Sequence, residues 1–387
     1  MKEQTNGLPQ ALSLLSAVRG IICALIALFV LELLTAAPAK QALAAGNEMK
    51  TGQIMEQLKF GTGFAKKTTT EKMLIPVGRA VGIKLFADGV MVVGISDVAG
   101  PKGACSPAKT CGLQEGDIIT YINQEKIQST EDLKAVLQNV GGQQMTIRLL
   151  RGGRLMQLDA KTVQTSDDGS YKLGAWTRDS MAGIGTLTFY DPESGVFGAL
   201  GHGINDVDTA LLVPLASGSI MQSTVTDVIR GQCGNPGELR GKFDLTADLG
   251  ELFANTDSGV FGTMADKSFI QNKTALPAAG RGAAKVGKAT ILTNVAGDAV
   301  REYEIEITRV YSGAGGPRNM MLKVTDPRLL ERTGGIVQGM SGSPILQNGK
   351  LIGAVTHVLI GNPTEGYGIF IESMLDQAFW QESENVS

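Results

Sequence analysis

The sequence predicts a mainly β protein that has an apolar segment near its N-terminus and two β-rich domains after it. Fifty of the 387 residues are glycine, about double the usual share of roughly 7%, which favours many short strands joined by turns. Short apolar runs bounded by Gly, Asp or Pro recur along most of the chain, and such runs are typical of strands. A chain of 387 residues exceeds one typical domain.

The composition excludes several classes of function. A net charge of −3 gives no reason to expect a nucleic-acid partner. The chain has four cysteines, which are too few for a disulfide scaffold and lack the paired spacing of zinc sites. We therefore expect no metal and no cofactor. A hydrophobic share of 43% is enough for substantial cores.

An uncharged run from Gly20 to Leu31 follows a basic start. The run is short for a transmembrane helix, suits the apolar region of a signal peptide, and is followed by small residues typical of a cleavage site. Residues 1–44 are thus expected to be a signal peptide or a membrane anchor, with a buried core helix as a third alternative. Residues 45–75 are polar and rich in lysine, and are predicted to be a linker open to proteolysis.

The stretch 76–163 is predicted to be the first domain. It has strand-like runs at 80–85, 90–95 and 145–150 and a helix that starts after Ser129. A Gly-Leu-x-x-Gly-Asp-x-Ile motif begins at Gly112, and the whole order resembles a PDZ domain of the circularly shifted bacterial type. The resemblance implies capture of a peptide beside an exposed strand edge, with Val81, Gly82 and Ile83 supplying the backbone N–H groups. Alternatively, the domain merely holds its neighbour or the linker.

Cys105 and Cys111 flank a short loop in this domain. In an exported protein they would be able to close a small disulfide loop, and free thiols are the alternative. Cys233 has no His or Cys near it in the sequence and is expected to be a free thiol.

Residues 170–387 are predicted to be a second domain of about ten short strands, which suggests a sandwich or a two-barrel protease. Its most informative stretch is Gly339–Pro344, which reads G-x-S-G-x-P. Small residues around Ser341 suit a tight turn that presents its hydroxyl, and the N–H groups of Gly339 and Ser341 are candidates for an oxyanion hole. A turn without chemistry is the alternative, and Ser343 is a rival nucleophile.

His202, one of only two histidines, lies between Gly201 and Gly203. It precedes Ser341, and base before nucleophile is the order of the chymotrypsin-like barrel. The other histidine, His357, is expected to be either a core residue or part of a specificity pocket.

Three motifs in order carry a further resemblance: 176–190, from Trp176 to Tyr190; 198–209, around His202; and 338–344, around Ser341. Together they resemble the stage IV B sporulation serine peptidase family. The resemblance implies a chymotrypsin-like double β-barrel with Ser341 as nucleophile, His202 as base and Asp326 as acid. On sequence alone Asp206 and Asp208 compete as the acid, or form a polar turn, because they lie close to His202.

The resemblance also implies a role. The chain would be an exported or membrane-anchored serine endopeptidase of endospore formation that faces the space between the mother-cell and forespore membranes. It would cleave its own N-terminal region and a membrane-bound regulator of an intramembrane metalloprotease, which then processes a late sigma factor. Two alternatives stay open, a PDZ-containing adaptor with an idle barrel and an envelope quality-control protease.

Overall fold

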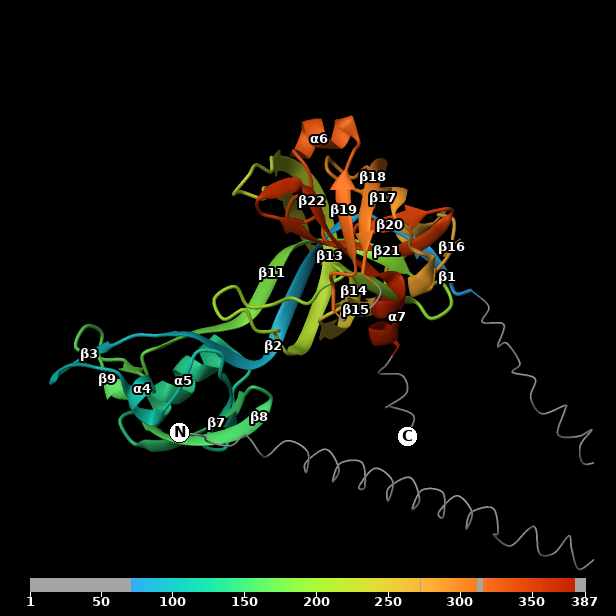
Figure 1. Cartoon of the computed structure of the whole chain (residues 1–387). Coiled ribbons are helices and arrows are strands. Elements are labelled where there is room, and N and C mark those ends of the chain that lie inside the picture. Colours follow the sequence, from blue (N-terminus) through green and yellow to red (C-terminus); the bar gives the residue numbers. More distant parts are fainter. Residues whose placement is uncertain (1–70, 272, 312–315, 380–387) are drawn as a thin grey trace, which may run out of the picture. The chain divides into compact units, whose positions relative to one another are not determined.

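The computed structural model describes residues 71–271, 273–311 and 316–379 (Figure 1). They belong to one compact unit that begins at Thr70. In this described part of the chain, no helix is both long enough and apolar enough to span a membrane. The predicted signal or anchor segment, 1–44, and most of the predicted linker, 45–70, lie outside the described residues.

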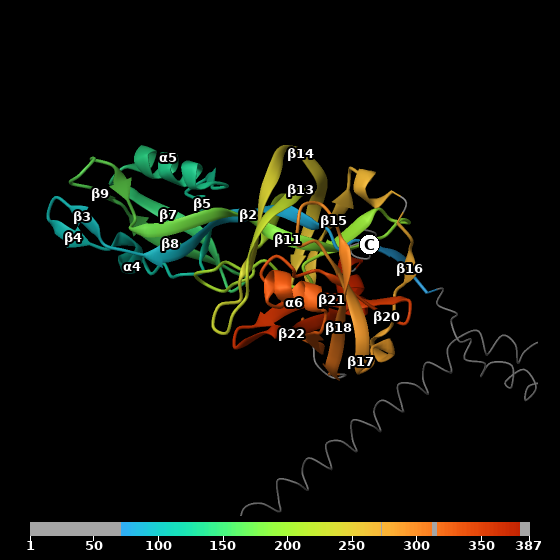
Figure 2. The same ribbon diagram turned by 90° about the horizontal axis from the view of Figure 1, so that it is seen from above.

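A cluster of buried apolar side chains between Val90 and Leu173 forms the core of the first domain. Its helix α5, Thr130–Val140, begins with the expected cap: Ser129 Oγ accepts from the N–H of Asp132, and the Asp132 carboxylate accepts from the N–H of Ser129. Figure 2 shows α5 lying along the strands of this domain. The other elements are β3 Val98–Gly100, β4 Gly103–Cys105, α4 Pro107–Cys111, β5 Ile118–Ile122, β6 Glu125–Lys126, β7 Gln144–Arg151, β8 Arg154–Lys161, β9 Val163–Gln164 and β10 Tyr171–Lys172.

The two strand-like runs at 80–85 and 90–95 form one continuous strand, β2, Ala80–Ile95. Its second half pairs with β5 at Val90 and Met91, whereas its first half belongs to the second domain. The core of the first domain therefore begins near Val90 instead of residue 76.

The expectation that Val81, Gly82 and Ile83 offer a peptide-binding edge is corrected by this arrangement. All three residues pair with β11, Ala175–Tyr190, on one side and with β13, Leu215–Ile229, on the other. A strand with neighbours on both sides has no unpaired N–H row for a third strand. The side chains of Val81 and Ile83 are buried in the core of the second domain.

Cys105 and Cys111 are free thiols in the structure, as is Cys233. The small disulfide loop is therefore absent, and the alternative of free thiols holds for the two cysteines of the first domain.

Six strands of the second domain form a ring of antiparallel pairings. Strand β2 pairs with β11 and β13, and the ring continues from β11 through β12, β15 and β14 back to β13. Side chains such as Leu187, Phe197 and Val260 fill its interior. The remaining strands of the ring are β12 Val196–Ala199, β14 Glu238–Thr256 and β15 Gly259–Met264, and β1 Met73–Pro76 and β16 Leu276–Pro277 extend the sheet beyond β11.

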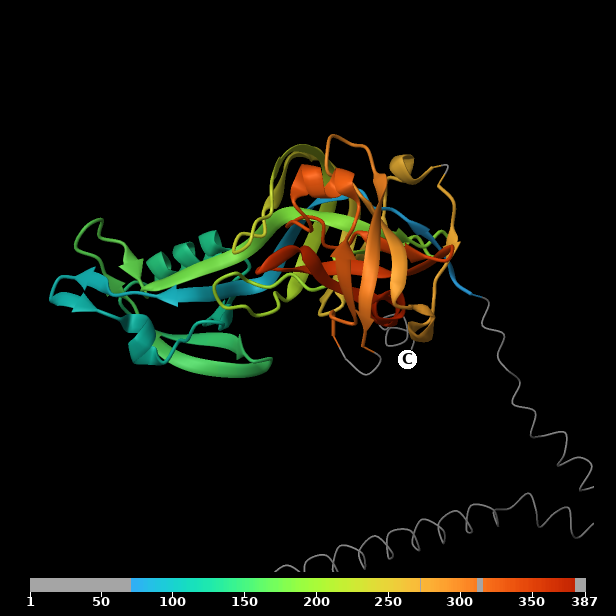
Figure 3. The same ribbon diagram turned by 45° about the horizontal axis from the view of Figure 1, so that its top comes forward.

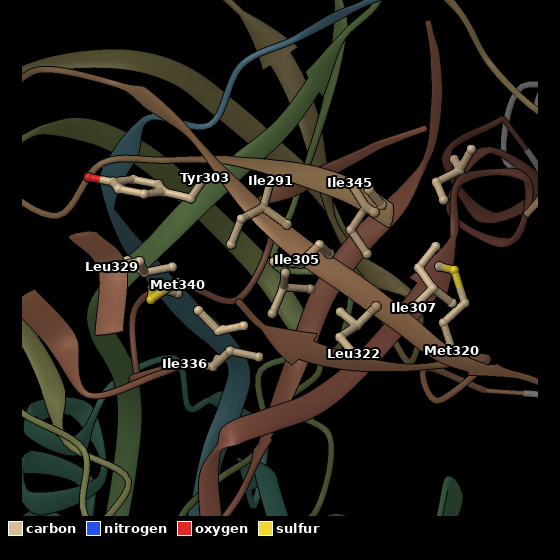
Figure 4. Packing of buried hydrophobic residues seen from close by; sticks show 14 of the residues in the cluster. Ile291, Tyr303, Ile305, Ile307, Met320, Leu322, Leu329, Ile336, Met340 and Ile345 are labelled. Carbon is tan, nitrogen blue, oxygen red and sulfur yellow. The ribbon is translucent and has the colours of Figure 1, made fainter. Parts of the chain in front are cut away.

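The rest of the second domain is a closed barrel with the strand order β17-β18-β19-β22-β21-β20 (Figures 1 and 3). Along β18 the buried residues Tyr303, Ile305 and Ile307 alternate with exposed ones, as expected when one face of a strand lines a core. Figure 4 shows these side chains with Met340 in one apolar cluster. The elements are η1 Ser268–Ile270, η2 Arg281–Ala283, β17 Gly287–Thr293, β18 Arg301–Val310, β19 Met320–Val324, α6 Pro327–Thr333, β20 Pro344–Gln347, β21 Lys350–Leu359, β22 Asn362–Phe370 and α7 Ile371–Ala378.

Candidate active site

The loop that carries Ser341 lies directly before β20 and is anchored on both sides of the serine. The side chain of Met340 is fully buried in the barrel core. Gly342 has φ +97°, and a Cβ at this position would lie 2.0 Å from the carbonyl oxygen of Thr186. Only glycine fits so close to β11 with this backbone conformation. The small residues that the sequence places around Ser341 are therefore required by the packing of the loop.

The predicted oxyanion donors, the N–H groups of Gly339 and Ser341, have no acceptor among the described residues. The carbonyl of Gln338 accepts from the N–H of Leu239 at 2.8 Å. The carbonyl of Met340 accepts from the N–H of Ser343 at 3.0 Å and from Ser343 Oγ at 2.7 Å. The C=O and N–H of a trans peptide point in opposite directions. The bonds of the Gln338 and Met340 carbonyls therefore fix the directions of the N–H groups of Gly339 and Ser341.

The two serines of the loop are bonded differently. Ser343 is fully buried, and its Oγ donates to Met340, which gives it a structural role instead of that of a nucleophile. Ser341 is partly exposed, and its Oγ donates to the carbonyl oxygen of Thr356 on β21 at 2.6 Å. The Ser341 hydroxyl must therefore leave Thr356 before it can donate to a base.

His202 lies in the loop that follows β12, after two residues with positive φ, Leu200 and Gly201. Its Nδ1 lies 2.8 Å from the carbonyl oxygen of Gly203. A carbonyl only accepts, so Nδ1 carries the proton and Nε2 is left as the basic nitrogen. Burial lowers the pKa of His202 below its ordinary value, and the Gly203 carbonyl opposes that shift in part. The histidine is therefore held in the neutral form that a general base requires.

Ser341 and His202 line the same cavity of about 390 Å³, together with Gly339. A larger cavity of about 620 Å³ lies beside β17 and β18, but its lining includes no serine, histidine or cysteine. Of these two cavities, the smaller one is lined by the candidate nucleophile, the candidate base and a predicted oxyanion donor. Its apolar lining includes Ile83, Met181, Ile184, Leu200 and Val207.

His357, which the sequence assigned to the core or to a specificity pocket, is a direct neighbour of His202. It is half-buried on β21, and its ring centroid lies 4.9 Å from that of His202, with 39° between the ring planes. Burial, and then the charges of His202 and Arg318, lower the pKa of His357 to about 4. His357 is therefore neutral at physiological pH. The only feature of the sequence that pointed to the active site was the place of His357 in the strand after the loop of Ser341.

Asp326 makes its contacts elsewhere. It is the N-cap of α6, where its carboxylate accepts from the N–H of Arg328 at 2.9 Å and from the N–H of Glu304 at 3.2 Å. It also forms an ion pair with the Arg328 side chain at 2.7 Å, and this contact lowers the pKa of Asp326 to about 2. Across residues 71–379 as described, it has no hydrogen bond or ion pair with His202. Its role as the acid stays a prediction.

Asp206 and Asp208 both pair with Arg178. Asp206 is buried, and its carboxylate also accepts from the N–H groups of Asp208 and Thr209. These bonds are typical of a polar turn, which is the alternative that the sequence left open beside a role as the acid.

Two family models match this chain. The model of the SpoIVB peptidase S55 family matches residues 169–375, and that of the PDZ domain matches residues 104–151. No curated protein matches the chain.

Among solved structures, the PDZ domain of the SdrC-like protein from Listeria monocytogenes is 24% identical, with 23% of this chain and 87% of that chain covered and a TM-score of 0.20. Two structures of the Rv3671c protease of M. tuberculosis, an active form and an inactive mutant form, are each 14% identical to this chain. Each match covers 52% of this chain and has a TM-score of 0.28. The match covers 73% of the active form and 82% of the mutant.

The match to residues 169–375 spans more than half of the 387 residues. It includes the loops of both His202 and Ser341, and the PDZ match lies just before it. The chain therefore belongs to the SpoIVB peptidase S55 family and is a serine peptidase with a PDZ domain.

Proposed function

We propose that this chain is an endopeptidase in which Ser341 is the nucleophile, His202 the base, and the N–H groups of Gly339 and Ser341 the oxyanion hole. The observation that carries the proposal is that Ser341 and His202 line one cavity although they come from different strand systems. His202 follows β12 of the six-strand ring, and Ser341 precedes β20 of the closed barrel. The two systems support a chymotrypsin-like double β-barrel whose catalytic groups meet between them.

The chemistry follows from the hydrogen bonds of the two residues. Rotation of the Ser341 side chain moves its hydroxyl from the Thr356 carbonyl to Nε2 of His202. Ser341 Oγ then attacks the scissile carbonyl carbon while Nε2 takes the hydroxyl proton. The resulting imidazolium keeps its Nδ1–H on the Gly203 carbonyl, and the negative oxygen of the tetrahedral intermediate accepts from the two N–H groups. His202 then gives its proton to the leaving amine, and water releases the acyl group.

The Gly203 carbonyl fixes the tautomer of His202, which is one of the tasks of the acid in a triad. Asp326 is the candidate for the acid only through the family resemblance. Its contacts are with Arg328 and Glu304, so we expect its replacement by asparagine to leave most of the activity.

The proposed biological role rests on the family. We infer that the enzyme is exported or membrane-anchored and acts during endospore formation, in the space between the mother-cell and forespore membranes. There it cleaves a membrane-bound regulator of an intramembrane metalloprotease and so triggers processing of a late sigma factor. Its own N-terminal region is a further substrate, since the lysine-rich stretch 45–70 leads directly into β1.

Self-processing gives the simplest test. The purified full-length chain is incubated and followed by mass spectrometry beside Ser341→Ala and the control Ser217→Ala, which alters an exposed serine on β13. We expect truncation between residues 45 and 75 in the wild type and in Ser217→Ala, and none in Ser341→Ala. Equal truncation in all three would assign the cleavage to a contaminant. A lack of truncation in all three would favour the adaptor.

A further inference from the structure

Thr186 is a fully buried polar residue on β11, in the six-strand ring, and it bonds to the loop of the nucleophile. Its Oγ1 donates to the carbonyl of Gly339 at 2.7 Å, and its N–H donates to the carbonyl of Ser341 at 3.0 Å. One residue of the ring thus holds the backbone on both sides of Met340.

Thr186 is also bonded to the loop of the base. Its carbonyl accepts from the N–H of Leu200 at 3.2 Å, two residues before His202. The same carbonyl lies 2.0 Å from the position that a Cβ of Gly342 would occupy, so the nucleophile loop packs directly on it. Both catalytic loops are therefore attached to one residue of β11.

The side-chain bond is the one that holds Gly339. This residue has φ +95°, and a glycine has access to many other backbone conformations at little cost. The N–H of Met340 donates to Val337 at 3.1 Å, and the carbonyl of the same peptide is fixed by Thr186 Oγ1. Without Oγ1, the peptide after Gly339 keeps only the bond of the Met340 N–H, so the backbone of Gly339 is less restrained. The N–H of Gly339, a predicted oxyanion donor, is then held less firmly.

We propose that Thr186 is a positioning residue for the oxyanion hole, acting through its hydroxyl on Gly339. This inference rests on the proposed peptidase mechanism, but its structural part, the restraint on Gly339, is measurable without catalysis. Thr186 is fully buried and is not among the residues that line the cavity of Ser341 and His202, so it is not itself a catalytic residue.

The test compares Thr186→Val with a matched control on the same strand. Thr188 is also fully buried on β11, but its Oγ1 has no hydrogen-bond partner among the described residues. The exchange of Thr for Val keeps the shape at both positions, and only at residue 186 does it remove a bond to the loop. A third variant, Thr186→Ser, keeps the hydroxyl. For each full-length protein, kcat and KM are measured on a peptide that spans the self-cleavage site, with active sites titrated.

We expect Thr186→Val to lower kcat about 10- to 100-fold with KM nearly unchanged, which is less than the roughly 10²- to 10³-fold loss when a donor is removed outright. Thr186→Ser should recover most of kcat, and Thr188→Val should match the wild type. A wild-type kcat in Thr186→Val would overturn the proposal. So would an equal loss of kcat in Thr188→Val.

Hydrogen exchange at the amide of Met340 separates this inference from the proposed function. We expect faster exchange in Thr186→Val than in the wild type and in Thr188→Val. If the wild type shows no Ser341-dependent cleavage but the exchange still rises, the proposed function fails while the restraint on Gly339 stands. Unchanged exchange at Met340 in Thr186→Val contradicts the restraint itself.

Discussion

Replacement of Asp326 by asparagine separates a structural role of this residue from a catalytic one. Asparagine caps a helix about as well as aspartate, so the bond from the N–H of Arg328 is retained. What is lost is the ion pair with the Arg328 side chain, which is the main cause of the low pKa of Asp326, about 2. The bond from the N–H of Glu304 is lost as well, because the amide nitrogen of asparagine cannot accept it. The variant should therefore be less stable, but still folded.

The size of the loss follows from the pKa. An ordinary aspartate has a pKa near 3.8, and each unit of difference corresponds to about 1.4 kcal/mol. The side chain of Arg328 is 64% exposed, so solvent screens the pair, and we expect Asp326→Asn to lower the free energy of unfolding by about 1 to 2 kcal/mol. Because the folded pKa lies below the unfolded one, this contribution is present above about pH 4 and disappears as the pH falls to about 2.

Urea denaturation at pH 7 and at several values between pH 4 and 2 measures this contribution. Arg328→Gln should lose a similar amount at pH 7, and the double variant should lose little more, since both changes remove the same pair. We expect kcat per titrated active site in Asp326→Asn to stay within about tenfold of the wild type, because the Gly203 carbonyl fixes the tautomer of His202. A loss of about 10⁴-fold in a folded variant would refute this reasoning and assign the acid to Asp326.

Three other predictions concern the same site. Burial lowers the pKa of His202 below its ordinary value of 6.5, so kcat/KM in a pH–rate profile should stay high until the pH falls below 6.5. A midpoint of the acid limb above pH 6.5 would contradict the burial of the ring. His357→Phe should keep kcat within a few-fold of the wild type, because it keeps a ring beside His202 and the Nδ1 of His357 has no partner in the described part of the chain. His357→Ala should lower kcat about tenfold. If steady-state kinetics show equal losses in the two variants, the ring nitrogens of His357 matter and this prediction is wrong. Gly342→Ala should lower the free energy of unfolding by about 2 kcal/mol or more, because of its positive φ and the contact with Thr186, and an unchanged melting temperature would contradict the close packing.

The local features of the fold were predictable from the sequence because they depend on nearby residues. The helix cap at Ser129 and Asp132 needs only residues three positions apart. The glycine at 342 likewise marks a backbone conformation that other residues rarely adopt. The loops of Ser341 and His202 were identified by the same kind of local pattern, and the structure brings them to one cavity.

Features that depend on strand pairing were not predictable in this way. The run 80–95 looks like two strands because Ala87, Asp88 and Gly89 interrupt its apolar residues, yet it is one strand shared by two domains. For that reason Val81 to Ile83 lie between two strands instead of at a free edge. The contacts of Thr186 join residues 153 positions apart, and no local pattern reports such a bond.

Covalent labelling tests most directly whether Ser341 is a nucleophile activated by His202. The full-length protein, Ser341→Ala and His202→Gln are treated with a fluorophosphonate probe, and the modified residue is located by mass spectrometry. We expect labelling of the wild type at Ser341, no labelling of this loop in Ser341→Ala, and a labelling rate at least about 10³-fold lower in His202→Gln. Labelling at Ser343, or an undiminished rate in His202→Gln, would contradict this expectation.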